Sequence, residues 1–260
     1  MRAMIFAAGL GTRLKPLTDN MPKALVPLGG KTLLQWQIEK LKGADIRDIT
    51  VNVHHFPDQI IDYLRDNDNF GCQIHISDER NALLDTGGGL RNAQCVMRNA
   101  QCAMRNEPIL VCNVDILSNI DLRQLIAAYR GDELGVLVVS ERETERYLLF
   151  DAEDRLHGWT NIRTGEVRPE GLDREKALRM RKLAFSGMQV LNPRIFDVMD
   201  EVVKQKGDKF SLIDLYLTLT EREVLRGYVP ENYHMMDVGK IGQIAEAEAF
   251  AESLYKHSNY

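Results

Sequence analysis

The segment Phe6–Thr18, FAAGLGTRLKPLT, places two glycines and two cationic side chains directly after an apolar run. Such a loop can bind phosphate, because glycine lets the backbone approach an anion and Arg or Lys neutralises its charge. It matches neither the Walker A loop nor the dinucleotide-binding fingerprint, whose third glycine is missing here. A plain turn between a strand and a helix would also explain Gly9 and Gly11, so the rest of the chain must decide.

The elements that would position this loop are short apolar runs separated by helical patterns. Runs of this kind are typical of buried parallel strands, and here they span Ala3–Ala8, Ile49–Val53, Ile74–Ser77, Ile109–Cys112 and Leu134–Val139. Between them, Leu34, Ile38 and Leu41 fall on one helical face. Asp121 can cap a further helix. Strands that alternate with helices predict a doubly wound α/β sheet.

The second half of the chain has a different pattern. Residues 140–184 are charged and less regular, AFSGMQVLNP then predicts a strand ending at Pro193, and helices are expected from about Pro193 and Ser211. No linker rich in Pro, Gly or Ser separates the halves, so we expect one domain over residues 1–260, with halves 1–140 and 141–260. The later part is expected to lie as a lid over the sheet edge, with a final helix packed back through Ile241, Ile244 and Ala249.

Three motifs are expected at one rim of this sheet, because ligands of such sheets bind outside the carboxyl ends of the strands. The first strand leads into Gly9–Arg13, and the third leads towards LLDTGGGL. The fourth ends in VCNVD, with Asp115 just beyond its apolar core.

The composition is that of a globular protein and argues against some functions. Of the 260 residues, 44% are hydrophobic and 27% charged; the net charge is -5 and the 33 basic residues are scattered, unlike those of a nucleic-acid-binding protein. No stretch approaches the roughly 20 apolar residues that span a bilayer, and the start lacks a signal-peptide layout. We therefore expect a cytoplasmic protein without membrane contact. Its cysteines are then expected as free thiols: Cys72, Cys95, Cys102 and Cys112.

The stretch Arg91–Asn106, RNAQCVMRNAQCAMRN, repeats a seven-residue unit almost perfectly. Seven residues nearly complete two helical turns, so the added unit keeps the same face buried while lengthening a helix by about 10 Å. We expect a helix extension without a chemical role.

The opening motif AAGLGTRLKPLTDNMPKALVPLGGKTLL is followed in order by DTGGGL, NVD, FSGMQVLNP and MMDVGK. In these motifs the chain resembles the sugar-1-phosphate nucleotidyltransferases along nearly its whole length. Among them it most resembles the N-acetylmuramate-1-phosphate uridylyltransferases, with mannose-1-phosphate and heptose-1-phosphate guanylyltransferases as near relatives. The resemblance implies a Rossmann-like, doubly wound mixed sheet of the GT-A-like nucleotide-diphospho-sugar transferase type. It also implies transfer of a nucleoside monophosphate from an NTP to a sugar 1-phosphate, with release of pyrophosphate.

This resemblance implies roles for charged residues and glycines. The reactants bring roughly six negative charges together, and each pair 4 Å apart repels by about 4 kcal/mol at an effective dielectric constant near 20. Arg13 and Lys23 are the expected catalytic cations, for the leaving pyrophosphate and the α-phosphate respectively. Asp115 and Asp237 are expected to hold Mg2+, which prefers one or two carboxylates together with phosphate oxygens. The expected nucleotide-binding residues of the opening motif are Ala8, Gly9, Gly11, Thr12, Arg13 and Lys23.

Recognition of the base stays open at this point. The resemblance implies that the base faces the segment containing Glu79, Asp85, Thr86, Gly87 and Gly88. Main-chain groups of Gly87 and Gly88 would suit uracil, whereas the Glu79 carboxylate would suit guanine.

The sugar-phosphate pocket is defined by fewer residues. Asn113, Ser186 and Gly187 are the candidates by position. Larger relatives carry a Glu-Lys-Pro sequence near the sugar phosphate that is missing here, so Arg181 or Lys182 are the candidate phosphate partners. An ionised sugar phosphate needs no general base, so His54 and His55 are expected to be structural.

We therefore expect a magnesium-dependent enzyme of peptidoglycan recycling that uses UTP and N-acetylmuramate 1-phosphate; GTP with mannose or heptose 1-phosphate is the alternative. A homodimer is left open. A non-catalytic nucleotide sensor is an alternative of another class, against which the intact set of Arg13, Lys23, Asp115 and Asp237 argues. A choline-phosphate cytidylyltransferase is a further alternative that the predicted sugar-side strand disfavours.

Overall fold

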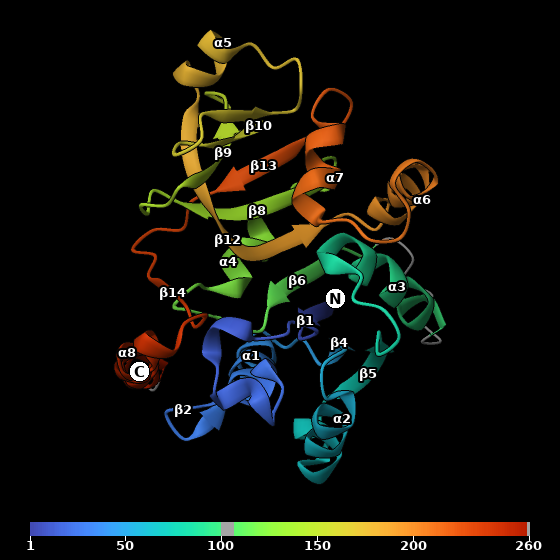
Figure 1. Ribbon diagram of the computed structural model, residues 1–260, viewed down its shortest axis with the longest axis vertical. Coiled ribbons are helices and arrows are strands. Elements are labelled where there is room, and N and C mark those ends of the chain that lie inside the picture. The colour runs from blue at the N-terminus through green and yellow to red at the C-terminus, as the bar shows by residue number, and fades with distance from the viewer. Residues whose placement is uncertain (100–106, 259–260) are drawn as a thin grey trace.

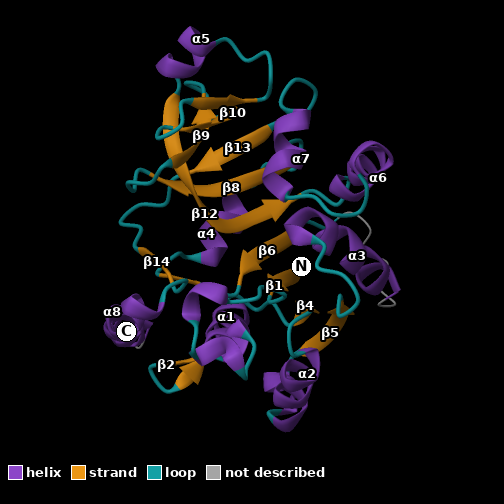
Figure 2. Ribbon diagram, viewed as in Figure 1, coloured by secondary structure: helices purple, strands orange, loops and turns teal. Residues whose placement is uncertain are grey.

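The computed structural model describes residues 1–99 and 107–258. They form one large mixed sheet with helices on both faces (Figures 1 and 2). The main path of the sheet is β11 (Glu166–Arg168), β10 (Leu156–Asn161), β9 (Arg146–Phe150), β12 (Arg181–Leu191), β6 (Ile109–Asn113), β1 (Arg2–Phe6), β4 (Asp48–Val53) and β5 (Gln73–Asp78). Off this path, β8 (Gly135–Ser140) pairs with β12, and β13 (Leu225–Tyr228) pairs with β8. The predicted doubly wound mixed α/β sheet in one domain is confirmed.

The helices bury two separate apolar cores against the two faces of the sheet. One core is covered by α1 (Leu33–Gly43), α2 (Pro57–Asp66), α4 (Leu122–Ala128) and α8 (Ile244–Ser258). The other is covered by α3 (Asp85–Asn99), α6 (Ile195–Lys206) and α7 (Leu212–Leu219), while α5 (Arg174–Arg179) packs on β9. Because strand side chains alternate between faces, Ala3 and Ile5 of β1 enter the first core and Met4 enters the second.

The N-terminal part of the sheet is parallel, as predicted. Strand β1 runs parallel to β4 and β6, and β4 runs parallel to β5. The carboxyl ends of these four strands therefore meet at one edge. The loops that follow them carry Gly9, Gly11, Glu79 and Asp115 to that edge. The loop after β1, residues 7–26, is called the signature loop below.

The expected lid over the sheet edge is wrong. Strand β12 of the second half lies inside the sheet and pairs antiparallel with β6, β8 and β9. The apolar run Leu134–Val139 forms β8, whose strand neighbours are β12 and β13. Of these outer strands, β11 is exposed at both ends, β10 alternates between buried and half-buried side chains up to Trp159, and β9 begins with the exposed Arg146. This partial exposure explains why this part of the sequence is charged and was not predicted as sheet.

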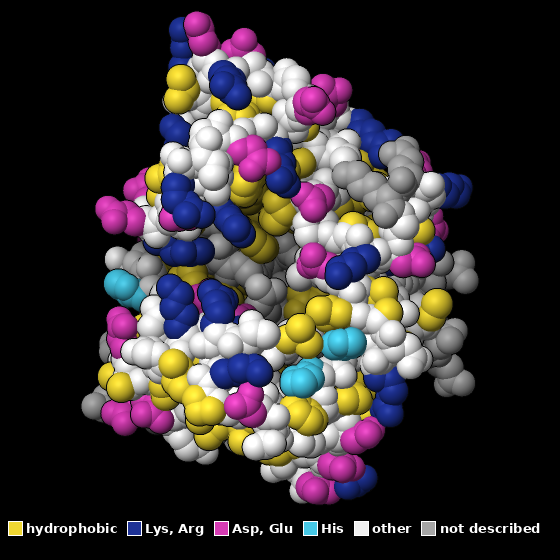
Figure 3. All heavy atoms as spheres, viewed as in Figure 1, with side chains coloured by type: hydrophobic (Ala, Val, Ile, Leu, Met, Phe, Trp, Pro, Cys, Tyr) yellow, Lys and Arg dark blue, Asp and Glu magenta, His cyan; other side chains and the backbone are white. Residues whose placement is uncertain are grey.

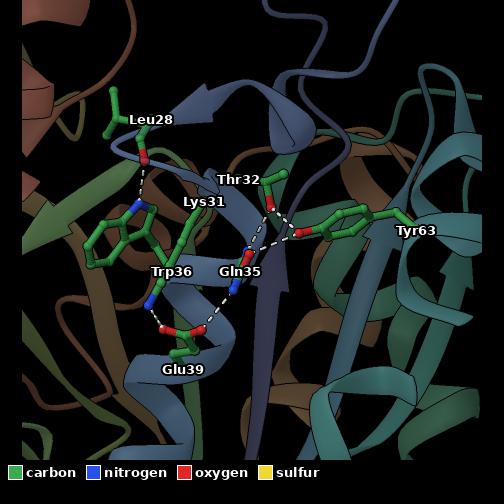
Figure 4. Close-up of polar contacts among 7 residues, drawn as sticks. All are labelled: Leu28, Lys31, Thr32, Gln35, Trp36, Glu39 and Tyr63. Carbon is green, nitrogen blue, oxygen red and sulfur yellow. Dashed lines mark hydrogen bonds and ion pairs between the residues drawn. The ribbon is translucent and has the colours of Figure 1, made fainter. Parts of the chain in front are cut away.

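Helix α1 is fixed at its start by polar contacts with neighbouring segments (Figure 4). Thr32 caps it by accepting a hydrogen bond from the backbone N–H of Gln35 at 3.0 Å. The Tyr63 hydroxyl from α2 lies 3.2 Å from Thr32 Oγ1, and the Trp36 indole donates to the Leu28 carbonyl at 3.0 Å. Helix α1 also contacts the turn that begins at Lys23.

Other predicted elements are confirmed in part. Asp121 caps α4, its carboxylate accepting from the N–H groups of Arg123 and Gln124 at 2.8 and 3.3 Å. The face predicted for the final helix is confirmed only at Ile244, which packs half-buried against the first core. Ile241 precedes α8 and is 43% exposed, Ala249 is exposed, and the buried residues of the helix are Ala247 and Ala251.

The duplicated stretch begins inside α3, which is described up to Asn99, so the predicted extension over residues 100–106 lies outside the described residues. Cys72, Cys95 and Cys112 are free thiols, and Cys102 is among the residues not described. Within the described ranges, no helix combines the length and apolar character needed to cross a membrane.

Candidate active site

The loop after β1 consists of short 3₁₀ turns at Thr12–Leu14, Leu17–Asp19 and Lys23–Leu25. Gly11 directly precedes the first of these turns and has a φ of 65°, in the left-handed region that favours glycine. Its carbonyl accepts a hydrogen bond from Thr18 Oγ1 at 2.8 Å, and an added Cβ would lie 2.8 Å from Thr18 Cγ2. Glycine at position 11 is therefore required by the loop itself. At Gly9 an added Cβ would meet no atom within 4 Å beyond its chain neighbours, so packing does not explain that glycine.

Lys23 and Asp115 form an ion pair across the sheet edge. Lys23 starts the third turn of the signature loop and is 8% exposed, while Asp115 follows β6. This ion pair therefore joins the loop after β1 to the loop after β6. Lys23 and Asp115, two of the predicted site residues, are neighbours at this edge of the sheet.

Asp237 is brought to Asp115 by a small second sheet. Strand β14 (Met235–Asp237) pairs antiparallel with β7 (Ile116–Ser118), which places Asp237 opposite Ile116. The N–H of Val238 donates to the Asp115 carbonyl at 2.8 Å. The two predicted metal ligands, far apart in sequence, therefore lie on adjoining turns.

The charges around Asp237 act in opposite directions. Burial raises the pKa of Asp237, and the negative charge of Asp115 raises it further. The positive charges of Lys23, Arg13 and Arg142 lower the pKa of Asp237. Arg13 is also close by geometry, because a Cβ added at Gly239 would lie 2.6 Å from Asp237 Oδ1 and 2.7 Å from Arg13 Nη2. The structure thus brings together Arg13, Lys23, Asp115 and Asp237.

These two carboxylates fit a divalent cation. The described residues hold no group of three or more His, Cys, Asp or Glu side chains suited to a metal. Mg2+ at Asp115 and Asp237 would therefore take its other ligands from phosphate oxygens and water, as this ion commonly does. Because Asp115 raises the pKa of Asp237, a cation between them would also relieve their mutual repulsion.

Helix α1 supports the turn that carries Asp115 from behind. Gln37 Nε2 donates to the Ile116 carbonyl at 2.6 Å, and Lys40 Nζ donates to the carbonyl and hydroxyl of Ser118 at 2.5 and 2.7 Å. Both side chains line a cavity of about 420 Å³ between α1, β7 and Leu254. Burial lowers the pKa of Lys40 to about 7. Sequence patterns gave no signal for this support, because Gln37 and Lys40 belong to an ordinary helix.

The triple glycine packs against the segment before α7. The N–H groups of Gly87 and Gly88 both donate to the Phe210 carbonyl, at 2.9 and 3.1 Å. A Cβ at Gly87 would lie 2.4 Å from the Phe210 ring, and one at Gly88 would lie 2.1 Å from the Asp208 carbonyl oxygen. In this structure these two amides are therefore paired within the chain, and contact of Gly87 or Gly88 with a base stays a prediction.

Glu79 is buried in a polar network below the signature loop. Its Oε1 accepts from Asn52 Nδ2 at 2.8 Å, and Asn52 Oδ1 accepts from the Ala7 N–H at 2.8 Å. Burial raises the pKa of Glu79, although the hydrogen bond from Asn52 acts to lower it. His54 Nδ1 lies 2.7 Å from the Glu79 carbonyl, consistent with the structural role expected for this histidine. Contact between Glu79 and a guanine stays a prediction.

Gly88, which is crowded by the chain itself, and Gly9, which has open space beside it, are expected to respond differently to substitution by alanine. Gly88→Ala should destabilise the protein by about 1–3 kcal/mol, because its Cβ would overlap the Asp208 carbonyl. Gly9→Ala should change the free energy of unfolding by less than about 0.5 kcal/mol but raise KM for the NTP, because its Cβ points into open space beside the expected phosphates. Urea unfolding and steady-state kinetics measure both; a Gly88→Ala protein as stable as wild type would contradict this assignment.

The predicted sugar-side residues meet at an irregular stretch of β12. The register of β12 on β8 shifts between Phe185 and Gln189, and Gly187 there has a φ of 67°. A Cβ at Gly187 would lie 2.8 Å from Asn113 Nδ2, so these two predicted residues are neighbours. Ser186 exposes no surface and lies beside the Tyr233 hydroxyl. The Ser186 Oγ has no hydrogen-bond partner among the described residues, and its contact with a ligand stays a prediction.

The predicted phosphate partners of the sugar side are not brought to the carboxylates. Arg181 pairs with Asp154 at 2.5 Å, and Lys182 lies on the part of β12 that pairs with β9. Arg142, which the sequence did not single out, donates instead to the Phe185 carbonyl at 3.0 Å. One face of the molecule is hollowed between its two halves, with Lys and Arg side chains gathered along one rim (Figure 3).

Cations and carboxylates that converge at the strand ends of such a sheet suit an enzyme that acts on phosphorylated substrates. The family model described as nucleotidyl transferase matches residues 2–253, so the chain belongs to that family. This confirms the enzyme class that the sequence motifs predicted through their resemblance to the sugar-1-phosphate nucleotidyltransferases.

Two relatives and one solved structure illustrate the likeness. The chain is 31% identical over 242 residues to the N-acetylmuramate alpha-1-phosphate uridylyltransferase of Caulobacter vibrioides, covering 90% of each protein. It is 36% identical over 150 residues to the mannose-1-phosphate guanyltransferase of Neurospora crassa, covering 56% of this chain and 40% of that protein. The crystal structure of HddC from Yersinia pseudotuberculosis complexed with GMP-PN shares the fold, with a TM-score of 0.71, 22% identity and coverage of 96% of this chain and 99% of that one.

Proposed function

We propose that this nucleotidyltransferase joins UTP to N-acetylmuramate 1-phosphate, giving the UDP-sugar and pyrophosphate, as a cytoplasmic enzyme of peptidoglycan recycling. The observation that carries the transfer reaction is the convergence of Arg13, Lys23, Asp115 and Asp237 at the strand ends. The choice of UTP is supported by coverage, because the uridylyltransferase relative matches over 90% of its length and the guanyltransferase relative over 40%.

In the proposed reaction, an oxygen of the sugar phosphate attacks the α-phosphorus of the NTP, and the bond from that phosphorus to the pyrophosphate oxygen breaks. Arg13 would bind the departing pyrophosphate through its forked guanidinium, and Lys23 would offset the charge that develops on the α-phosphate. Mg2+ held by Asp115 and Asp237 would supply further neutralisation of the phosphates. The attacking oxygen is already ionised, so this chain needs no general base.

GTP with mannose or heptose 1-phosphate is the second candidate. It is favoured by the 36% identity to the guanyltransferase relative over 150 residues. The pairing of the Gly87 and Gly88 amides within the chain also weakens one reason for preferring uracil.

Pyrophosphate release measured with each of the four NTPs against N-acetylmuramate, N-acetylglucosamine, mannose and heptose 1-phosphates tests the proposal. We expect the highest kcat/KM for UTP with N-acetylmuramate 1-phosphate. A higher value for GTP with mannose or heptose 1-phosphate would establish the second candidate. Saturable NTP binding without turnover of any acceptor would instead indicate a non-catalytic sensor.

A further inference from the structure

Arg142 lies at the same sheet edge as the predicted metal ligands. Strand β12 runs antiparallel to both β6 and β8, so β6 and β8 run in the same direction. Their carboxyl ends therefore share one edge. Asp115 stands two residues beyond the end of β6, and Arg142 stands two residues beyond the end of β8.

The Arg142 side chain is directed to the irregular stretch of β12. Its Nη2 donates to the Phe185 carbonyl at 3.0 Å, directly before Ser186 and Gly187. An added Cβ at Gly187 would lie 2.8 Å from Asn113 Nδ2 and 3.0 Å from Ile116 Cγ1. Arg142 is thus tied to the backbone that packs against the turn carrying Asp115.

The surroundings of Tyr233 agree with this position. Tyr233 lies beside Ser186, and the positive charge of Arg142 acts to lower the pKa of Tyr233, although burial raises it. Arg13 and Lys23 come from the loop after β1, whereas Arg142 comes from the segment after β8.

The guanidinium of Arg142 is also available for an anion. Its side chain is exposed, and no ion pair joins it to a carboxylate within residues 1–99 and 107–258. One of its five N–H donors is used by Phe185, which leaves a forked pair suited to two phosphate oxygens. Arg181, by contrast, is held by Asp154 and Glu141.

We propose that Arg142 binds the phosphate of the sugar 1-phosphate, in place of the Arg181 or Lys182 expected from the sequence. The inference rests on the proposed transfer reaction and deepens it. Arg13 and Lys23, from the loop after β1, then serve the NTP, while Arg142, from the turn after β8, neutralises the attacking phosphate. The acceptor phosphate would then lie beside the turn after β8, next to the irregular stretch of β12.

Arg142→Gln tests this assignment through substrate affinity. Loss of a charged hydrogen bond to phosphate should raise KM for the sugar 1-phosphate by about 10- to 100-fold, with KM for the NTP changed less than about twofold. Arg142→Lys should recover part of the loss, because it keeps the charge but not the fork. Arg146→Gln is the matched control: this exposed cation at the start of β9 should leave both constants unchanged.

Calorimetric titration with N-acetylmuramate 1-phosphate, mannose 1-phosphate and glucose 1-phosphate gives a readout that does not depend on turnover. If wild type binds the sugar 1-phosphate but transfers no nucleotide to it, the proposed reaction is overturned. Weaker binding of the sugar 1-phosphate by Arg142→Gln than by wild type would still support the assignment of Arg142. Equal binding by Arg142→Gln and wild type would overturn the assignment alone, as would a loss that appears in Arg181→Gln or Lys182→Gln instead. No binding by wild type would overturn both.

Discussion

Asp115→Asn is expected to lower kcat by about 10²- to 10³-fold or more, because it removes one of the two carboxylates available to a divalent cation. Two effects on stability oppose each other: the ion pair with Lys23 is lost, and the repulsion that raises the pKa of Asp237 is relieved. Asparagine has the same shape and still accepts a hydrogen bond from Lys23. Pyrophosphate release gives kcat, circular dichroism gives Tm, and Mn2+ binding followed by electron paramagnetic resonance reports the metal directly.

Asp121→Asn is the matched control for this substitution. Asp121 also follows a strand, but its carboxylate caps α4, and asparagine is an equally good capping residue. This variant should keep full kcat and full Mn2+ affinity. If Asp115→Asn retained more than about a tenth of the wild-type kcat, or bound Mn2+ as tightly, the assignment of Asp115 as a metal ligand would be refuted.

The sequence predicted the parts of the site that follow from strand direction. Parallel strands present their carboxyl ends at one edge, so the loops after β1 and β6 had to converge once the apolar runs were recognised. Asp237 was different, because β14 belongs to a separate small sheet, and only the resemblance of MMDVGK to a family motif predicted its position.

Other features could not be read from residue type alone. A glycine is required wherever a Cβ has no room, whether a ligand or the chain itself occupies the space. At Gly88 the occupant is the Asp208 carbonyl, a contact between residues distant in sequence. Arg142 carried no motif and could be recognised only after β8 was placed beside β12, since that pairing decides which edge the residue reaches. The predicted lid failed for a similar reason, because half-exposed strands have the composition of a charged surface segment.

Replacement of Lys23 is expected to have opposite effects on two properties of the site, its affinity for a divalent cation and its rate of nucleotidyl transfer. In the structure Lys23 is paired with Asp115, so its ammonium neutralises the same carboxylate that is expected to bind Mg2+. Lys23→Met should therefore increase the affinity for a divalent cation measured without nucleotide, by about tenfold or more, because a unit charge 4 Å away contributes about 4 kcal/mol at an effective dielectric constant near 20. The same variant should lose about 10²- to 10³-fold in kcat, because the α-phosphate loses its fixed cation.

Tighter metal binding together with slower turnover would distinguish Lys23 from a structural cation. Lys15→Met provides the comparison, since Lys15 lies in the same loop and pairs with Asp19 at 3.1 Å on the surface, and it should change neither quantity by more than about twofold. Mn2+ titration and single-turnover kinetics measure the two effects separately. Should Lys23→Met bind Mn2+ no better than wild type, Asp115 would not be the carboxylate that receives the metal, and the positive charge at Lys23 would act on the phosphates alone.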